Sequence, residues 1–400
     1  MAQPKAASAA AQLSLAASAC IAGAEAAAMV GREGAPAMVA AAAMVVIGHR
    51  GKGMNALGSA DPRLREVKEN SLRSFHAAAR VAGVSYVEFD VQVTKDGYPV
   101  IFHDDFIFTE QDGEICGRRV TDLRLDEFLS YGPQKDQSKA GKPLFRKLND
   151  GRVLRWDVQS DDALCTLQEA LDGVDRRVGF NVELKFDDDV VYREMELTGI
   201  LQAILKAYGK TVVFEHAKER PIFFSSFQPD AARIMRKLQD RYPVYFLTKG
   251  GTQVFADERR NSLEAAVKLC VAGGLRGIVS EARAVLRQPS AIGRIKEAGL
   301  SLLTYGQLNN VPKAVCLQQL MGVDGVIVDL VAEIAAAVSE FAAAAAAVPV
   351  PERDSSSSYM DGGGDVGLLE TTSPAARTTA SFSRREDVSF LLRLIPELVQ

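Results

Sequence analysis

The sequence predicts an α/β fold, a closed (β/α)8 or TIM barrel, with a small subdomain inserted between the second strand and its helix. Short apolar strands alternate with amphipathic helices along most of the chain, and this alternation is typical of a parallel sheet. Eight strands can be counted when one further strand is treated as an accessory, and the series ends with a helix. Eight strand–helix units favour a closed barrel over an open sheet.

The units follow one another from Met44. Strands are expected at short apolar runs, and helices where apolar residues recur every three to four positions. Residues 99–103 are expected to form the accessory strand. The expected strand–helix units are 44–48 with 69–82, 84–93 with 167–171, 178–186 with 190–208, 221–227 with 230–240, 244–247 with 263–271, 277–280 with 290–298, 300–305 with 311–321, and 325–329 with a last helix from Val331.

Outside these units the composition changes. Within the barrel domain, 44–346, residues 105–165 lose periodicity and are expected to form the insertion, as a subdomain or a lid. Residues 1–43 are an Ala-rich extension, which fits a plastid transit segment, a signal sequence or a disordered extension. Residues 347–383, rich in Pro, Ser and Gly, predict a disordered linker. Residues 384–400 predict a helix that docks on the barrel or meets a partner.

The composition excludes several classes of protein. The chain has 400 residues, 47% of them hydrophobic, and a net charge of −4, so it lacks the basic character of a nucleic-acid-binding protein. No run has the length and hydrophobicity of a transmembrane helix. The five cysteines are scattered, which argues against a disulfide framework and favours buried thiols in a reducing compartment. We expect an intracellular protein of the plastid or cytoplasm, with no signal for an oligomeric state.

Polar side chains gather where the predicted strands end, and active residues of barrels lie at these ends. Glu88 and Asp90 share one face of the second strand, and Glu183 lies on the third. Three carboxylates cannot share a buried barrel mouth without a partner. They therefore predict a divalent cation, and three oxygen ligands suit Mg²⁺ or Ca²⁺ better than zinc.

The remaining strand-end residues supply groups that could bind a phosphate and transfer protons. Arg50 and Lys185 are cations that suit a phosphate. His49 and His103 have near-neutral pKa values and suit a general acid and a general base. Taken singly, each has a structural explanation, such as a pairing of a carboxylate with a barrel Lys or Arg. Taken together, they predict hydrolysis of a phosphodiester.

Other polar residues are expected to be structural. His76 lies on the apolar face of a helix and is expected to be a packing residue, whereas His216 is expected to be solvated. The run 187–189 is acidic throughout. It is expected to form a solvated loop or to cap the next helix.

At these residues the sequence resembles the glycerophosphodiester phosphodiesterase family. The likeness covers roughly residues 45–338, and the insertion and the block 390–399 are similar to the plant branch of the family. The matching stretches occur in the family's order. They are Gly48-His49-Arg50-Gly51, Glu69-Asn70-Ser71, residues 88–97, His103-Asp104, Glu183-Leu184-Lys185 and Ser225-Ser226-Phe227.

The resemblance implies a role for each group of residues. It implies a TIM barrel with an inserted subdomain, in which Glu88, Asp90 and Glu183 hold Mg²⁺ or Ca²⁺. His49 and His103 match the acid–base pair, and Arg50 and Lys185 match phosphate-binding cations. The supporting residues behind them are expected to be Glu69, Asn70 and Ser226.

The resemblance also implies the reaction. In the family's scheme, a glycerol hydroxyl attacks first and water then opens a cyclic phosphate. The products are sn-glycerol 3-phosphate and an alcohol such as choline or ethanolamine, in phospholipid turnover and in glycerol and phosphate recycling. The expected partner is this small-molecule substrate alone. One departure concerns a Trp that many members carry near the end of the seventh strand, because this chain has Tyr305 there and its single Trp, Trp156, in the insertion.

Two alternatives stay open at this point. A phosphodiesterase of the lysophospholipase D type would cut lysophospholipids at the head group, and it would need an apolar entrance for the acyl chain. A non-catalytic barrel would only bind phosphodiesters. The loss of a histidine or a carboxylate from the set would favour the second alternative, and the sequence has kept them all.

Overall fold

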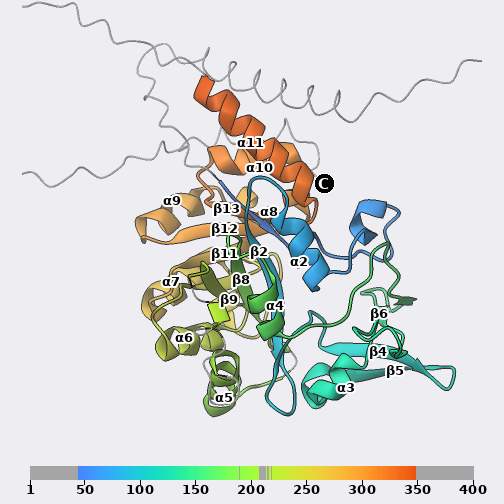
Figure 1. Ribbon diagram of the computed structural model, residues 1–400. Helices are drawn as coiled ribbons and strands as arrows, with labels where there is room; N and C mark the ends of the chain where they lie inside the picture. The colour runs from blue at the N-terminus through green and yellow to red at the C-terminus, as the bar shows by residue number, and fades with distance from the viewer. Residues whose placement is uncertain (1–43, 189, 207–212, 214–215, 218, 348–400) are drawn as a thin grey trace, which may run out of the picture.

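A computed structural model describes residues 44–188, 190–206, 213, 216–217 and 219–347 of the chain. Eight parallel strands form a closed ring, since β1 pairs with both β13 and β2. The predicted (β/α)8 barrel is confirmed (Figure 1). In ring order the strands are β1 (Val45–Gly48), β13 (Gly325–Val328), β12 (Ser301–Tyr305), β11 (Gly277–Glu281), β10 (Val244–Thr248), β9 (Ile222–Ser226), β8 (Gly179–Leu184) and β2 (Val84–Val93).

The accessory strand and the outer helices also follow the sequence pattern. Strand β3 (Pro99–Ile101) lies antiparallel to β2. Among the helices around the barrel, α8 (Ala282–Arg287) was not predicted, because its six residues follow β11 directly. The predicted helices are α2 (Leu72–Ala79), α4 (Leu167–Gly173), α5 (Glu194–Leu205), α6 (Pro229–Leu238), α7 (Leu263–Gly273), α9 (Ser290–Glu297), α10 (Pro312–Leu320) and α11 (Val331–Ala347). Short 3-10 turns are η1 (Pro62–Arg65), η2 (Val120–Asp122), η4 (Glu258–Arg260) and η5 (Gln307–Asn310).

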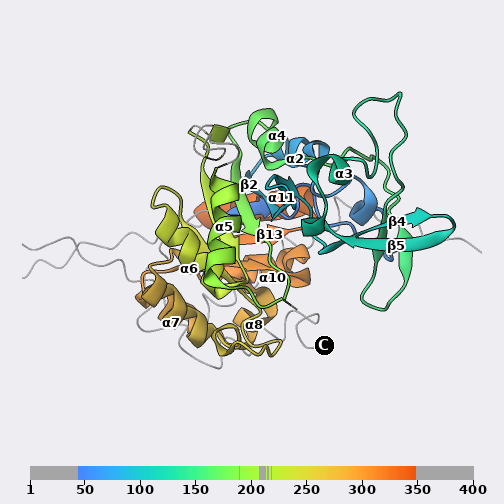
Figure 2. The same ribbon diagram turned by 90° about the horizontal axis from the view of Figure 1, so that it is seen from below.

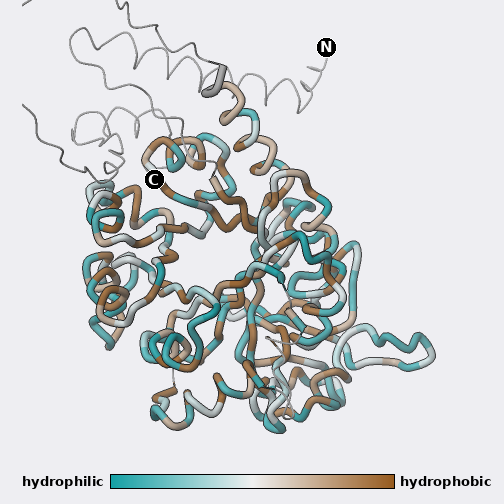
Figure 3. Tube along the Cα trace, turned by 60° about the vertical axis from the view of Figure 1, so that its left-hand side comes forward, coloured by the Kyte–Doolittle hydropathy of each residue, from teal (hydrophilic) through white to brown (hydrophobic). Residues whose placement is uncertain are grey.

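Two apolar layers position the site. Alternate side chains of each strand point outward and pack with the helices, as Val87, Phe89 and Val91 of β2 do. The inward apolar side chains of six strands fill the barrel interior: Ile47, Phe223, Leu247, Val279, Leu303 and Ile327. Figure 3 shows hydrophobic stretches along the central strands and alternation on the surrounding helices. Inward polar side chains nearer the carboxyl ends of the strands are therefore left at the mouth of a packed barrel.

The insertion is a small subdomain with its own sheet. Its strand order is β5 (Glu114–Arg119), β4 (Phe106–Gln111), β6 (Phe145–Lys147) and β7 (Val153–Arg155), and α3 (Leu125–Leu129) accompanies it. A separate apolar cluster, which includes Phe102, Phe128 and Trp156, forms its core. Figure 2 shows the β4–β5 hairpin on the side opposite α5, α6 and α7. These strands were not predicted, because β5 is exposed almost throughout and shows no alternation.

Several expectations fall elsewhere. The N-terminal extension, the linker beyond Ala347 and the helix expected at 384–400 lie outside the described residues, as does Cys20. Within the described part of the chain, no helix combines the length and apolar character needed to cross a bilayer. The expectation of buried thiols is wrong for Cys116, which is exposed on β5, and correct for Cys165, Cys270 and Cys316.

Candidate active site

The loop after β1 holds the first histidine. His49 donates from Nδ1 to Oδ1 of Asp329, 2.7 Å away, at the end of β13. The same carboxylate accepts from the backbone N–H of Met54 and the side chain of Asn310, at 2.9 and 2.8 Å. The loop needs Gly53 at this point, because its φ is +127° and a Cβ would lie 2.4 Å from the carbonyl oxygen of Asp329. The imidazole of His49 is thus fixed, with Nε2 4.0 Å from Oε2 of Glu88.

The second histidine is held in the same way. His103 donates from Nδ1 to Oδ1 of the adjacent Asp104, at 2.7 Å. A carboxylate on Nδ1 sets the tautomer and leaves Nε2 for chemistry. Burial and the charges of Arg50 and Lys185 lower the pKa of His103 well below its usual value. Burial also acts to lower the pKa of His49, but Asp329 outweighs it and raises this pKa.

The three predicted carboxylates come together between the histidines. Glu88, Asp90 and Glu183 each place an oxygen within 4.8 Å of the others. The parallel register explains this, since Asp90 of β2 lies opposite Glu183 of β8. Oε2 of Glu88 accepts from the backbone N–H of Arg50 at 2.8 Å, whereas the buried Oε1 has no hydrogen-bond partner among the described residues.

The electrostatics of this carboxylate cluster fit a divalent cation. Burial and the neighbouring charges of Asp90 and Glu183 raise the pKa of Glu88. Burial likewise raises the pKa of Glu183. The pKa of Asp90 is lowered, because His103, Arg50 and Lys185 together outweigh its burial. Two buried carboxylates and one partly buried carboxylate, with an unsatisfied oxygen on Glu88, are a suitable ligand set for a hard cation.

The two predicted cations flank the cluster. Arg50 donates from Nη1 to Oε1 of Glu69 at 2.8 Å, and its Nε lies 3.5 Å from Oδ2 of Asp90. Lys185 places Nζ 3.1 Å from Oε1 of Glu183 and 3.8 Å from Oδ1 of Asp90. Both cations therefore lie where an anion at the cluster would meet them.

The supporting residues differ in how directly they contact the carboxylate cluster and its cations. Asn70 donates to Oδ2 of Asp90 at 2.8 Å, and Glu69 binds Arg50 directly. Ser226 instead donates to the carbonyl oxygen of Leu184 at 2.8 Å. It braces the end of β8 and, among the described residues, makes no hydrogen bond to the cluster.

Sequence reasoning missed two residues that complete this site. Asp329 was only the end of a predicted strand, although the strand-end rule applied to Glu88 would have found it. Arg146 of β6 binds both Glu69 and Asp104. No sequence signal points to it, because it lies in the aperiodic insertion.

Two expectations about other polar residues are correct only in part. The acidic run after Lys185 is a loop in which Asp188 is exposed, but Asp187 is buried and pairs with Arg119, and Asp188 pairs with Arg260. It does not cap α5, whose cap position is Arg193. His216 hydrogen-bonds Asp172 at 2.7 Å and is half-buried. Asp189 lies outside the described residues.

The missing Trp of the seventh strand is replaced by another aromatic ring. Tyr305 ends β12 and packs edge-on against Phe227, with ring centroids 5.9 Å apart. Its hydroxyl donates to the carbonyl oxygen of Thr248 at 3.3 Å. Trp156 is buried in the subdomain core instead, under the guanidinium of Arg146.

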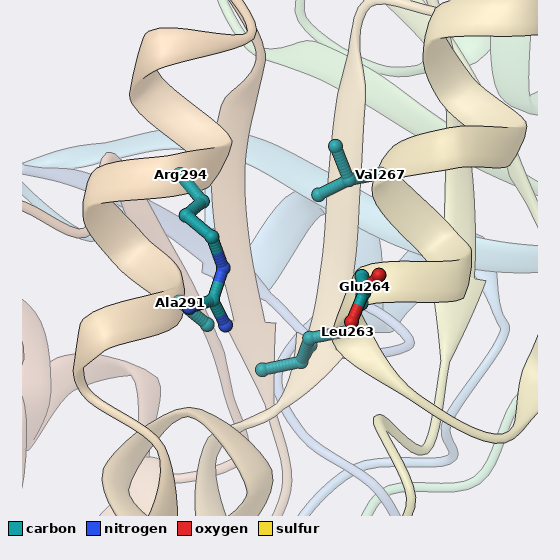
Figure 4. A pocket seen from close by; sticks show the side chains of 5 residues that line it. All are labelled: Leu263, Glu264, Val267, Ala291 and Arg294. Atoms are coloured by element: carbon teal, nitrogen blue, oxygen red, sulfur yellow. The ribbon is translucent and has the colours of Figure 1, made fainter.

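A pocket on the helical ring is separate from this site. It lies between α7 and α9, and Figure 4 shows Glu264 and Arg294 approaching it from the two helices. None of the predicted site residues lines it. Its lining residues are Leu263, Glu264, Val267, Ala291 and Arg294.

Fold and site together define an enzyme, a hydrolase on a TIM barrel with two histidines and three carboxylates at its carboxyl-terminal mouth. The chain belongs to the glycerophosphoryl diester phosphodiesterase family, whose model matches residues 49–333. It is therefore a phosphoric diester hydrolase of this class.

Two relatives agree with this membership, and solved structures share the fold. The chain is 52% identical to the Glycerophosphodiester phosphodiesterase GDPD2 of Arabidopsis thaliana, over 89% of each chain. It is 50% identical to the chloroplastic GDPD1 of the same plant, over 89% of this chain and 90% of that one. A putative glycerophosphoryl diester phosphodiesterase from Silicibacter pomeroyi shares the fold, with a TM-score of 0.55 and 21% identity over 77% of this chain and 95% of that one.

A further solved structure carries a ligand. A phosphodiesterase of Oleispira antarctica, in complex with the product sn-glycerol-3-phosphate, has a TM-score of 0.51 and 22% identity. The alignment covers 74% of this chain and 96% of that one. At this identity the likeness shows the fold alone.

Proposed function

We propose that this chain hydrolyses glycerophosphodiesters such as glycerophosphocholine and glycerophosphoethanolamine to sn-glycerol 3-phosphate and an alcohol, in a reaction that depends on Mg²⁺ or Ca²⁺. One observation carries the proposal. The cluster of Glu88, Asp90 and Glu183, with a buried and unsatisfied oxygen on Glu88, lies between two histidines that are each held by an aspartate.

The proposed roles follow from charge and position. Glu88, Asp90 and Glu183 hold the metal, which when bound supplies positive charge to a phosphate oxygen. Arg50 and Lys185 bind the remaining phosphate oxygens. His103, with its lowered pKa, is the neutral base, and His49, with its raised pKa, carries the proton of the acid.

These roles give a balanced two-step reaction. His103 accepts the proton of a glycerol hydroxyl, whose oxygen bonds to phosphorus while the bond from phosphorus to the head-group oxygen breaks. His49 gives its proton to that departing oxygen, and a cyclic phosphate remains. Water then opens the ring, losing a proton to His49, and His103 returns its proton to the glycerol oxygen. Both histidines end as they began.

A panel of substrates tests the proposal. Hydrolysis of glycerophosphocholine and glycerophosphoethanolamine is measured with EDTA, and again with added Mg²⁺ or Ca²⁺. We expect turnover only with metal, and its loss in H49A and in H103A. Turnover that persists in EDTA contradicts the role of the carboxylates. Binding without turnover would indicate a non-catalytic barrel.

Exposed apolar side chains support a second substrate class, the lysophospholipids. Val191, before α5, and Val254, between β10 and η4, are 95% and 82% exposed. The pair of Asp188 and Arg260 links these two loops. An acyl chain is the part of a lysophospholipid that such side chains would contact. The variant V191S/V254S is expected to lose turnover of lysophosphatidylcholine and to keep that of glycerophosphocholine.

The proposed location is the plastid or the cytoplasm. The likeness to a relative named chloroplastic supports the plastid. A fluorescent protein fused after residue 400 distinguishes the two. The proposed division of the chain keeps the barrel domain at 44–346 with its insertion at 105–165, followed by the linker 347–383 and the helix 384–400.

A further inference from the structure

We propose that Arg146, a residue of the inserted subdomain, is a positioning residue that sets His103 and Arg50 relative to each other. The inference rests on the proposed function, because it concerns how that site is assembled. Arg146 does not reach the carboxylate cluster itself. It acts through two carboxylates, Glu69 and Asp104.

The contacts form an unbroken chain from the base to the phosphate-binding cation. His103 donates to Oδ1 of Asp104, and Arg146 donates from Nε to Oδ2 of Asp104 at 2.8 Å. Arg146 also donates from Nη2 to Oε1 of Glu69 at 2.6 Å and from Nη1 to Oε2 at 3.2 Å. The same Oε1 accepts from Arg50 at 2.8 Å. Every link is a charge-assisted hydrogen bond of ordinary length.

Only arginine has the geometry for this position. Its planar guanidinium presents donors on two edges, so that it binds Glu69 with one and Asp104 with the other. Lysine is a single point charge on a flexible stem and cannot hold both carboxylates in one plane. Arg146 is 7% exposed, so water is poorly placed to replace these bonds.

The subdomain fixes the guanidinium from the other side. Arg146 stacks on Trp156 with its central carbon 3.7 Å from the ring centroid, and Trp156 donates from Nε1 to Oδ1 of Asn55 at 3.1 Å. Asn55 in turn donates from its backbone N–H to Glu69, and its carbonyl oxygen accepts a hydrogen bond from Arg146. The core of the insertion and the loop after β1 are therefore joined through Arg146 and Trp156. The insertion takes part in building the site.

A double-mutant cycle tests whether Arg146 acts on His103 through Asp104. The variants are R146M, R146K, D104N and R146M/D104N, with R118M as the control, because Arg118 is an exposed arginine of the same sheet with one ion pair, to Glu127. Glycerophosphocholine turnover with saturating metal gives kcat and KM, and thermal unfolding reports folding. We expect kcat to fall at least tenfold in R146M, less in R146K, and less than twofold in R118M.

The double variant distinguishes an effect of Arg146 through Asp104 from a general loss of stability. If Arg146 acts through Asp104, kcat of R146M/D104N lies within twofold of the lower single variant. Losses that multiply, or a folded R146M with the kcat of wild type, overturn the proposal. Should R146M not fold, the same cycle is run with R146K. A wild-type chain that hydrolyses no phosphodiester refutes the proposed function itself, which distinguishes the two failures.

Discussion

At the scale of single residues, the site depends on aspartates that orient its histidines. Asp329 and Asp104 each bind Nδ1 at 2.7 Å, although they come from different parts of the chain. In such pairs the carboxylate fixes the tautomer and stabilises the imidazolium. The two imidazoles differ in the charges around them, which push their pKa values in opposite directions.

Replacing Asp329 with Asn should expose this role. The D329N side chain can donate to Nδ1, which favours the wrong tautomer of His49. We expect kcat to fall by about a hundredfold, within the usual contribution of acid–base catalysis. Asp324 immediately precedes the same strand, β13, at its opposite end, and it accepts a hydrogen bond from the backbone N–H of Leu302 at 2.7 Å. The control D324N should keep kcat, and an equal loss in both variants would contradict the role of Asp329.

Lys68 gives a prediction about stability and pH. Its side chain is 2% exposed, Nζ has no hydrogen-bond partner among the described residues, and burial lowers its pKa from 10.5 to about 8. Between these pH values the unfolded chain binds more protons than the folded one, so the free energy of unfolding rises with pH there. Below about pH 8, Lys68 destabilises the fold by roughly 3 kcal/mol.

The variant K68M should therefore be more stable than wild type at pH 7. We expect the gain to shrink as the pH rises from 8 and to vanish near 10.5. Urea unfolding at a series of pH values measures it. A gain that does not change with pH would mean that packing, and not charge, causes it.

At the scale of elements, the loop between β1 and α2 packs closely against the end of β13. Gly53 packs against the backbone of Asp329, which cannot move aside as a flexible side chain could. The variant G53A should lose about 1–3 kcal/mol of stability from backbone strain and should also lose turnover, because the clash separates His49 from its partner. Gly97 is the matched control, since its φ is +86° but nothing lies within 4 Å of an added Cβ. G97A should lose stability alone.

The sequence predicted elements best where local pattern and burial agree. Strand β2 was predicted with its observed ends, Val84 and Val93, because its alternation separates the barrel interior from the helices. The strand-end rule then located the carboxylates and histidines. The strands of the insertion were not predicted, since β6 and β7 have only three residues each. Arg146 and the partners of Asp187 and Asp188 depend on contacts between distant segments, which periodicity does not encode.

At the scale of the whole molecule, the carboxylates at the mouth repel one another, and burial raises the pKa of Glu88 and of Glu183, so the charged forms of these two groups oppose folding. Metal binding should relieve this repulsion. Mg²⁺ or Ca²⁺ at about a hundred times its dissociation constant should add about 2.7 kcal/mol to the free energy of unfolding, which thermal unfolding detects without an activity assay. In E183Q the unfolding temperature should rise without metal and respond less to it. A metal-induced shift of the same size in E183Q would place the ion elsewhere.

The bond between His49 and Asp329 joins residues 280 positions apart. It crosses the seam where β1 meets β13 and closes the ring. During synthesis on the ribosome, His49 is made early, and Asp329 is made only when nearly the whole barrel has been synthesised. A chain that ends before residue 329 has the three carboxylates and both histidines in its sequence, but it lacks the group that orients His49. The bond between His49 and Asp329 can therefore form only late in biosynthesis, after all eight strands of the ring have been made.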